Sequence, residues 1–517
     1  MSYSNSPHIL CVNPWTHDFA AFDFWAKPIG LLQLAAIIRE GGARVTFLDC
    51  LDRFHPKAVE EASALNSGKG IKVLSDGRGP FRKRVIPFPE GVELLNAELS
   101  PAKRLSAEKK LFNGKSFSRY GIEPDWFRQD LENIKKRAEQ KASQPLDSDH
   151  RVTDTEMGYP DLILVTSLMT YWASGVRETI SVIKEIFPDV PVVLGGIYAT
   201  LCTEHARKNS MADQVVTGSG EEQIYDIIKS CTGFELNLNP QLKLNPSDLN
   251  LFPYPALDLV SNLTYAPILT SRGCPFSCTY CASSFLEPKL RQRSPELVFD
   301  EIRYWHERYG VHKFAFYDDA LLINPEKYIL PLLDKILSYS SDFKHSCKIS
   351  SSSVKSSAPL EFHTPNALHI RQITGEIADM MFKTNFKTIR LGLETTDFSN
   401  FRKADVKVKA DEFYHAVAVL KQAGFKREQI GAYLLCGLPG QNLDDVERSI
   451  LLVKQIGIVP ILAYYTPIPH TPMWKDAVKY SRFDLETEPL FTNNALIPCL
   501  NSEHEIKRIS ELKKMAK

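Results

Sequence analysis

The feature that most constrains this chain is a regular alternation of short apolar runs with longer amphipathic stretches, in two separate parts of the sequence. In the first part, from Pro7 to about Ser230, stretches such as GLLQLAAIIREGG repeat apolar residues every three or four positions, as helices do. Apolar runs between such helices are typical of a parallel sheet covered by helices. We therefore predict an α/β doubly wound parallel sheet. Its strands are expected in HILCVN, VTFLD, LILVTS, VVLGG and QVVTGSGE.

The second part begins near Tyr265 and repeats the alternation of strand and helix six times. Ser294 followed by Pro295 is a typical helix start, and Gly310 and Gly424 stand where helices are expected to end. Six parallel repeats predict a partial (β/α)6 barrel of the TIM type, with functional loops at the carboxyl ends of its strands. Its strands are expected in APILTS, KFAFYDD, PLEFHT, TIRLGLE, IGAYLLCG and PILAYYT.

A chain of 517 residues is too long for one ordinary core, and the pattern divides it into four regions. We predict a Rossmann-like domain over 1–234, a linker rich in Asn and Pro over 235–262, and the partial barrel over 263–480. A closing helical region is expected over 481–517, where Ser502 and Glu505 form a capping box.

A long insertion, from about 52 to 158, separates the second and third strands of the first domain. Connections of this length are uncommon and often functional, so a lid or a substrate-selecting role stays open. Its basic stretches are interleaved with acidic residues, which favours a solvated surface over a nucleic-acid arm. Within it, PDWFRQDLENIKKRAEQKA is expected to be a solvated helix.

The composition is that of a soluble globular protein, with 44% hydrophobic residues, 24% charged residues and a formal net charge of zero. Balanced charge predicts no general attraction to nucleic acid or to anionic membranes. No window approaches the roughly 20 apolar residues of a spanning helix, and MSYSNSPHILCVN lacks the pattern of a secretory signal. We therefore expect a cytoplasmic protein with no membrane partner.

Three cysteines, Cys274, Cys278 and Cys281, lie within eight residues in RGCPFSCTYC, directly after the first predicted barrel strand. Soft thiolates this close together favour one iron–sulfur centre, and three ligands leave one iron of a four-iron cube open for chemistry. A structural zinc site would need a fourth ligand, and the next histidine, His306, lies well into the following helix. A redox pair of Cys278 and Cys281 is a further alternative, but it leaves Cys274 without a role.

Small, flexible and polar residues stand at the expected carboxyl ends of the strands in the first domain. Ligands of open parallel sheets bind outside these ends, and glycines there let a bulky ligand approach the backbone. The alternative for each glycine is that it only makes a turn. The candidate residues are Asn13, Ser167, Gly195, Gly196, Gly218, Gly220 and Glu221.

The Cys-x3-Cys-x2-Cys spacing after the first strand of a partial barrel resembles the radical S-adenosylmethionine superfamily, and the aromatic Tyr280 before the last cysteine fits that pattern. The resemblance implies that the three cysteines are the catalytic metal ligands of a [4Fe-4S] cluster whose open iron is chelated by S-adenosylmethionine. One electron from the cluster would break a carbon–sulfur bond and yield a 5′-deoxyadenosyl radical. The contacts to S-adenosylmethionine that the resemblance implies are Tyr280, Glu394, Gly437, Leu438 and Gly440.

Three features near that site have competing interpretations. Glu394, in RLGLETTD, either contacts S-adenosylmethionine or pairs with Arg390 or caps the next helix. Asp318 and Asp319 end the second barrel strand and either contact a ligand or form a turn. His470, in YYTPIPHTP, is expected to be structural.

A doubly wound domain before such a barrel resembles the cobalamin-binding branch of the superfamily, with similar strings in VTSLMTYW, LGGIYATL and VVTGSGEEQI. Other cobalamin proteins supply a histidine to cobalt from Asp-x-His-x-x-Gly, but around His17 this chain has Trp15 and Ala20 in the Asp and Gly positions. The resemblance therefore implies cobalamin bound without a protein imidazole. Tyr171 and Trp172 either face the corrin or pack in the core. The implied contacts are Asn13, Ser167, Leu168, Tyr171, Trp172, Gly195, Gly196, Gly218, Gly220 and Glu221.

Together these resemblances imply an enzyme that methylates an unactivated carbon, with methylcobalamin as donor and a second S-adenosylmethionine to remethylate it. Radical cyclisation or rearrangement is the alternative within the same architecture. A methylthiotransferase would need a second cluster in the first domain, and although Cys11 and Cys50 end strands there, no cysteine lies between Cys50 and Cys202. An electron carrier would need no open iron. The implied partner is a one-electron donor such as flavodoxin or ferredoxin, and the substrate stays open.

Overall fold

A computed structural model describes residues 6–21, 26–64, 81–89, 114–142, 158–346, 358–398 and 408–517. The chain forms two compact units. The first unit contains the described residues up to 262 together with 486–496. The second contains 263–485 and 497–517. Among the described residues, no helix is long and apolar enough to cross a bilayer.

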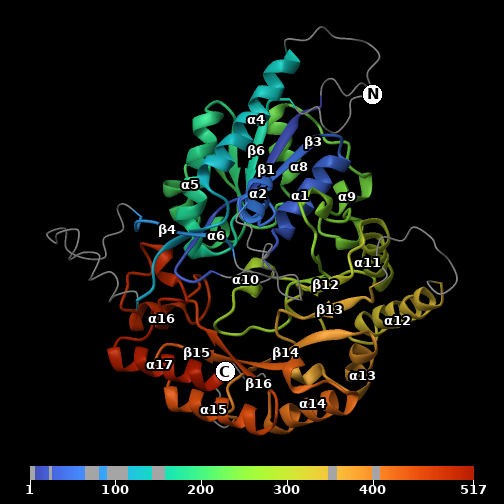
Figure 1. The fold of residues 1–517 in the computed structure, drawn as a ribbon, viewed down its shortest axis with the longest axis vertical. Helices are drawn as coiled ribbons and strands as arrows, with labels where there is room; N and C mark the ends of the chain where they lie inside the picture. The colour runs from blue at the N-terminus through green and yellow to red at the C-terminus, as the bar shows by residue number, and fades with distance from the viewer. Residues whose placement is uncertain are drawn as a thin grey trace. The chain divides into compact units, whose positions relative to one another are not determined.

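The first unit is built on a five-stranded sheet in which all neighbouring strands run parallel (Figure 1). The strand order is β3-β1-β6-β7-β8, so the order reverses next to β1, as a doubly wound sheet requires. The five predicted strands are all present: the first has its predicted bounds, the second is one residue longer, and the last three are shorter. They are β1 (His8–Asn13), β3 (Arg44–Asp49), β6 (Leu162–Val165), β7 (Val192–Leu194) and β8 (Gln214–Val215).

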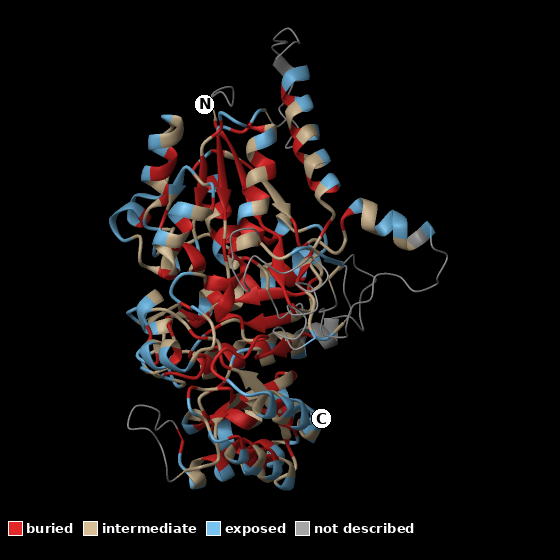
Figure 2. Cartoon of the chain, turned by 90° about the vertical axis from the view of Figure 1, so that its left-hand side faces the viewer, coloured by how far each residue is buried: buried red, intermediate tan, exposed pale blue. Residues whose placement is uncertain are grey.

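Both faces of this sheet are buried, because successive side chains of β1 point into different cores. Leu10 and Val12 join a core with α4 (Pro124–Ala142) and α5 (Ala173–Ile186). Ile9 and Cys11 join a second core with α1 (Ile29–Glu40) and α8 (Ile224–Thr232). Figure 2 shows the resulting concentration of buried residues along the strands. Strands buried on both faces explain why the sequence reads as continuous apolar runs.

Two strands from the described parts of the insertion form a small antiparallel sheet with a strand that follows β1 in the first unit. Its order is β2-β5-β4, with β2 (Thr16–Asp18), β5 (Ser118–Tyr120) and β4 (Lys83–Val85). The same region contributes α2 (Pro56–Ala64) and α4, whose bounds match the predicted helix. The prediction that α4 is a solvated helix was wrong for one face, because Phe127 and Leu131 are fully buried in the core.

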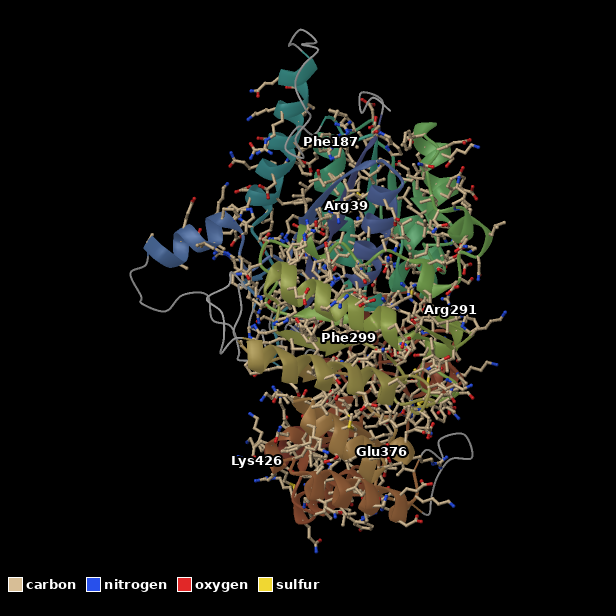
Figure 3. All side chains as sticks on the ribbon, turned by 90° about the vertical axis from the view of Figure 1, so that its right-hand side faces the viewer. Arg39, Phe187, Arg291, Phe299, Glu376 and Lys426 are labelled. Atoms are coloured by element: carbon tan, nitrogen blue, oxygen red, sulfur yellow. The ribbon has the colours of Figure 1, made fainter. Side chains whose placement is uncertain are left out.

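The predicted linker over 235–262 is instead a packed part of the first unit. It contains α9 (Pro240–Leu244) and the short 3-10 turns η3 (Leu249–Leu251) and η4 (Leu257–Leu259). Leu236 and Ala256 belong to the core beside α1. Arg39 of α1, labelled in Figure 3, forms a bidentate ion pair with Asp258 at 2.7 and 2.9 Å. Buried apolar side chains spaced without a helical or strand period explain why sequence pattern did not reveal this packing.

The second unit holds a six-stranded parallel sheet whose order follows the chain, β16-β15-β14-β13-β12-β9. This is the strand number, direction and order that the predicted partial barrel requires, while its curvature as a barrel stays a prediction. The strands are β9 (Ala266–Ile268), β12 (Lys313–Phe316), β13 (Glu361–His363), β14 (Phe386–Glu394), β15 (Ile430–Cys436) and β16 (Val459–Tyr464). The longer helices are α11 (Pro295–Tyr309), α12 (Ile329–Ser346), α13 (Gly375–Lys383), α14 (Ala410–Ala423), α15 (Leu443–Gln455) and α17 (Glu503–Ala516).

The helix ends agree with their sequence signals. The Ser294 side chain accepts a hydrogen bond from the amide of Leu297, and Gly310 ends α11 in the left-handed conformation. The capping box of Ser502 and Glu505 starts α17 as predicted. α17 then packs against α15 and β16.

The C-terminal region is divided between the two units, which the sequence did not predict. Residues 486–496, here named the return segment, belong to the first unit. Its turn η7 (Pro489–Thr492) packs on η2 (Thr170–Trp172), where the hydroxyls of Thr170 and Thr492 lie 3.0 Å apart. The predicted single closing region over 481–517 is therefore corrected to a return segment and a separate closing helix, α17.

Candidate functional site

The three cysteines lie on a loop that leaves the carboxyl end of β9 in the second unit. The short strands β10 (Ser271–Arg272) and β11 (Arg291–Gln292) pair across the base of this loop. Gly273, just before Cys274, has φ +83°, and a Cβ there would lie 2.7 Å from the carbonyl oxygen of Lys289. Only glycine fits this close approach of two backbones, so the local sequence sets where the first cysteine projects.

The three thiols are neighbours, and all three are partly buried. Burial, together with the nearby Asp319, Cys278 and Cys281, raises the pKa of Cys274 to about 11. Within the described ranges, no three His, Cys, Asp or Glu side chains come close enough together to share one metal ion. Three cysteines on one short loop fit a [4Fe-4S] cluster, in which each cysteine binds its own iron.

Two side chains that the sequence did not single out lie against these sulfurs. The Cys274 sulfur lies 3.8 Å from Nε2 of His369, which follows β13. The Cys281 sulfur lies 3.2 Å from the Ser283 hydroxyl and 3.4 Å from the Ser283 amide. The Ser283 hydroxyl also donates to the carboxylate of Asp319. Ser283 could have been found from its position two residues after Cys281, whereas no local pattern marks His369.

Two residues predicted from separate motifs to contact S-adenosylmethionine meet in the structure. The phenol of Tyr280 is hydrogen-bonded to the Glu394 carboxylate, and burial together with that carboxylate raises the pKa of Tyr280. Glu394 ends β14 with φ +66°, beside a register shift in the pairing with β15. A non-glycine residue held in the left-handed region is a strained conformation that is common at functional sites.

The predicted ledge after β15 is held by a glutamine that the sequence analysis missed. Gly437 and Gly440 both have positive φ, +88° and +65°. Oε1 of Gln441 accepts hydrogen bonds from the amides of Gly437 and Leu438, at 2.7 and 3.2 Å. Nε2 of Gln441 donates to the carbonyl of Leu435 at 2.9 Å. The loop is therefore pre-organised by a side chain inside it.

The paired aspartates at the end of β12 have different surroundings. Asp318 is buried and accepts hydrogen bonds from the amide and hydroxyl of Thr270 and the hydroxyl of Ser271, so it joins β12 to the start of the cysteine loop. Asp319 instead reaches Ser283. The ring of His470 stacks on Phe285, with centroids 4.3 Å apart.

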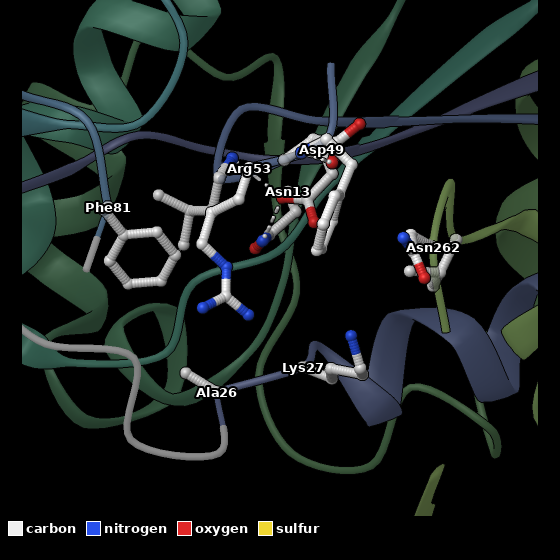
Figure 4. A pocket seen from close by; sticks show the side chains of 11 residues that line it. Asn13, Ala26, Lys27, Asp49, Arg53, Phe81 and Asn262 are labelled. Carbon is white, nitrogen blue, oxygen red and sulfur yellow. Dashed lines mark hydrogen bonds between the residues drawn. The ribbon is translucent and has the colours of Figure 1, made fainter. Parts of the chain in front are cut away.

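In the first unit, Asn13 lines a pocket at the carboxyl ends of β1 and β3 (Figure 4). Its side-chain amide donates to Asp49 at 2.7 Å, and burial raises the pKa of Asp49 to about 6. Lys27, Arg53 and Phe81 are among the other walls of this pocket. The sequence predicted only Asn13 of this group, because apart from Asp49 at the end of β3 the other walls come from segments without a recognisable motif.

A second group of predicted residues comes together at the ends of β6, β7 and β8. The Ser167 hydroxyl donates to the carbonyl of Gly195 at 2.7 Å. Gly196 has φ +97°, and a Cβ there would lie 2.4 Å from the Ser167 carbonyl oxygen. Thr200, which the sequence analysis missed, links this turn to the next, since its hydroxyl donates to the Gly196 carbonyl and accepts from the Gly218 amide.

The remaining residues predicted for the first unit lie beside these turns or inside the core. Leu168 is half-buried directly after Ser167, Gly220 packs near Leu34, and Glu221 lies 3.1 Å from the hydroxyl of Ser219.

Tyr171 and Trp172 are both buried. The Trp172 indole donates to Asp18 at 2.7 Å. His17 is held within the first unit, with Nε2 2.7 Å from Glu178 and Nδ1 3.2 Å from the hydroxyl of Ser174. Burial lowers the pKa of His17. An imidazole engaged on both nitrogens agrees with a corrinoid site that uses no histidine ligand.

Comparisons with known proteins identify both parts of the chain. The Radical SAM superfamily model matches residues 268–453, and the B12 binding domain model matches residues 146–228. An uncharacterized methyltransferase of Pyrococcus horikoshii is 24% identical over 345 residues, which are 62% of this chain and 70% of that protein. The bacteriochlorophyllide d C-12(1)-methyltransferase of Chlorobaculum tepidum is 24% identical over 308 residues, 57% of this chain and 62% of the enzyme.

The fold is similar to that of a solved structure over almost the whole chain. This is the radical S-adenosylmethionine methyltransferase TsrM of Kitasatospora setae with cobalamin and a [4Fe-4S] cluster bound, with a TM-score of 0.59 and 14% identity, covering 99% of this chain and 91% of that one. A radical SAM domain implies a [4Fe-4S] cluster and S-adenosylmethionine, and a B12 binding domain implies cobalamin. The chain belongs to the radical S-adenosylmethionine superfamily, in the branch whose members carry a B12 binding domain ahead of the radical domain.

Proposed function

We propose that this chain is a cobalamin-dependent radical S-adenosylmethionine methyltransferase that methylates an unactivated carbon. The observation that carries the proposal is the hydrogen bond between Tyr280 of the cysteine loop and Glu394 of β14, because it brings the three cysteines and a carboxylate together at the carboxyl ends of the strands. Methyl transfer is preferred over cyclisation because both curated relatives described above are named methyltransferases.

In the second unit, Cys274, Cys278 and Cys281 hold the cluster. When bound, the cluster supplies the electron that cleaves S-adenosylmethionine reductively. Tyr280 and Glu394 orient S-adenosylmethionine through polar contacts. The adenine of S-adenosylmethionine packs against the backbone of the pre-organised loop of Gly437, Leu438 and Gly440. A loop already held by its own hydrogen bonds costs less entropy when the ligand binds.

In the first unit, two groups of residues bind the corrinoid. The turns around Ser167, Gly196 and Gly218 admit a ligand close to the backbone, and the pocket of Asn13 and Asp49 offers polar groups to its amide side chains. When bound, cobalamin supplies the methyl group. One turnover consumes two molecules of S-adenosylmethionine and releases 5′-deoxyadenosine, methionine and S-adenosylhomocysteine. Two electrons enter from a one-electron donor such as flavodoxin or ferredoxin, and we place the enzyme in the cytoplasm with no nucleic-acid partner.

The methylthiotransferase alternative is disfavoured by where the first unit's cysteines point. Cys11 and Cys50 are both fully buried, but they belong to different cores, on opposite faces of the sheet. Two thiols separated by a packed sheet cannot bind the same cluster. The sequence had left this alternative open because both cysteines end neighbouring strands.

The test is anaerobic reconstitution of the full chain with iron, sulfide and hydroxocobalamin, followed by reduction with S-adenosylmethionine present. We expect about four irons and one corrinoid per chain, and formation of 5′-deoxyadenosine. Replacing Cys274, Cys278 and Cys281 by Ala should abolish iron uptake and 5′-deoxyadenosine, while the control Cys231→Ala on α8 should change neither. Retention of 5′-deoxyadenosine in the triple variant would contradict the proposal, as would about eight irons and no corrinoid in the unmodified chain.

A further inference from the structure

His369 touches the cysteine loop at two points. Its Nε2 lies 3.8 Å from the Cys274 sulfur, within hydrogen-bonding distance for a sulfur acceptor. Its ring also packs on Phe276, with centroids 4.2 Å apart and planes inclined by 46°. The imidazole is therefore fixed against the residue that carries the first thiol and against the loop that follows it.

The backbone beside His369 is tied to β14. The Leu368 amide donates to the carbonyl of Arg390 at 2.7 Å, and the Gly392 amide donates to the carbonyl of Leu368 at 3.1 Å. The next residues form the short 3-10 turn η5 (Ile370–Gln372). Because strand pairing holds this backbone, the imidazole has its place before any ligand binds.

A histidine beside a cysteine sulfur can act as a further metal ligand or as a hydrogen-bond donor to that sulfur. A Cys3His zinc site would bring four side chains to one ion. In the parts of the chain that the structure describes, not even three such side chains converge in this way. The geometry thus favours the donor role.

We propose that His369 is a positioning residue that donates a hydrogen bond from Nε2 to the Cys274 sulfur and so raises the reduction potential of the bound cluster. This inference rests on the proposed function, since it assumes that the cysteines hold an iron–sulfur cluster. Hydrogen bonds to the sulfurs tune the potential of such clusters because they stabilise the added negative charge of the reduced state. The cluster takes one electron from its donor, and His369 gains and loses none.

The test measures the midpoint potential of the reconstituted full-length chain without S-adenosylmethionine or corrinoid, by electron paramagnetic resonance of samples poised at fixed potentials. His369→Phe keeps a ring against Phe276 but removes the donor, whereas His369→Gln keeps an amide donor near the position of Nε2. His415→Phe, at an exposed position of α14, is the control. At a given potential we expect the ratio of reduced to oxidised cluster in His369→Phe to be at least threefold lower than in the unmodified chain. This corresponds to a shift of the midpoint potential by about 30 mV to more negative values.

The midpoint potentials of His369→Gln and His415→Phe should stay close to that of the unmodified chain. An unchanged potential in His369→Phe with four irons bound would overturn the proposal. Loss of iron in both His369 variants would also overturn it, because His369 would then hold the metal itself. Failure of the unmodified chain to take up a cluster would instead contradict the proposed function, so the two failures are distinguishable.

Discussion

The phenol of Tyr280, within the cysteine loop, is hydrogen-bonded to the carboxylate of Glu394 at the end of β14. One residue stands next to a predicted cluster ligand, and the other ends a strand near the middle of the six-stranded sheet. Their contact fixes the loop against the strand end where the sequence analysis had placed S-adenosylmethionine.

Removing this contact should weaken S-adenosylmethionine binding without loss of the iron–sulfur cluster. Tyr280→Phe and Glu394→Gln are each expected to raise the Kd about tenfold, which corresponds to about 1.4 kcal/mol. Equilibrium binding to the reconstituted protein measures the Kd, and iron analysis checks that about four irons remain. A normal Kd in both variants would show that the pair serves only to fold the loop.

Two adjacent glycines offer a matched test of the first unit. Gly196 has φ +97° and ψ −165°, a region that only glycine occupies readily, and a Cβ there would overlap the Ser167 carbonyl oxygen. The nearest atom to a Cβ on Gly195 is 4.0 Å away. Gly196→Ala should therefore destabilise the first unit by roughly 3 kcal/mol and reduce corrinoid retention.

Gly195→Ala should leave the stability of the first unit unchanged, because a Cβ there would lie no closer than 4.0 Å to any described neighbour. Urea unfolding and corrinoid content after gel filtration measure the two effects. Equal behaviour of the two variants would mean that the turn does not have the described backbone conformation.

The packing of the return segment on the rest of the first unit should depend on Asp18. This buried carboxylate accepts hydrogen bonds from the Trp172 indole at 2.7 Å and the Asn493 amide at 3.0 Å, as well as from backbone amides. Asp18→Ala leaves several buried donors unpaired and should cost about 3 kcal/mol, whereas Asn493→Ala should cost about 1 kcal/mol.

Limited proteolysis within 486–496 reports release of the segment, with Asp226→Ala on the exposed face of α8 as control. We expect cleavage to be fastest for Asp18→Ala, then Asn493→Ala, and slow in the control. Uniform cleavage rates would contradict the anchoring role of Asp18.

His8 should make the first unit less stable in mild acid. Burial lowers its pKa to about 4, with Nδ1 donating to the Gly158 carbonyl at 2.6 Å and Nε2 accepting from the Thr46 hydroxyl at 2.7 Å. Between pH 6.5 and 4 the unfolded chain binds a proton at this position that the folded chain does not. Stability therefore falls as the pH falls through this window, by about 3 kcal/mol in total.

His8→Gln cannot titrate, so the free energy of unfolding should depend less on pH between 7.5 and 5 than in the unmodified chain. Urea unfolding at several pH values measures the slope. Identical slopes would show that groups other than His8 control the loss of stability in acid.

Local patterns in the sequence determined the elements and the candidate cluster ligands. All eleven strands of the two parallel sheets lie largely within their predicted runs, and β8 is much shorter than its run QVVTGSGE, which includes turn residues. Cys274, Cys278 and Cys281 were found because ligands on one short loop must be close in sequence. Tyr280 and the glycine turns were found for the same reason.

Only the tertiary structure decided which distant residues surround these loops. Strand pairing brings His369 to Cys274 and Glu394 to Tyr280, and folding joins Thr200 to two glycine turns and Asn493 to Asp18. It also packs 235–262 and 486–496 into the first unit, against the predicted division. A periodic pattern encodes which face of an element is buried, but it does not encode the partner, which depends on contacts between residues far apart in the chain.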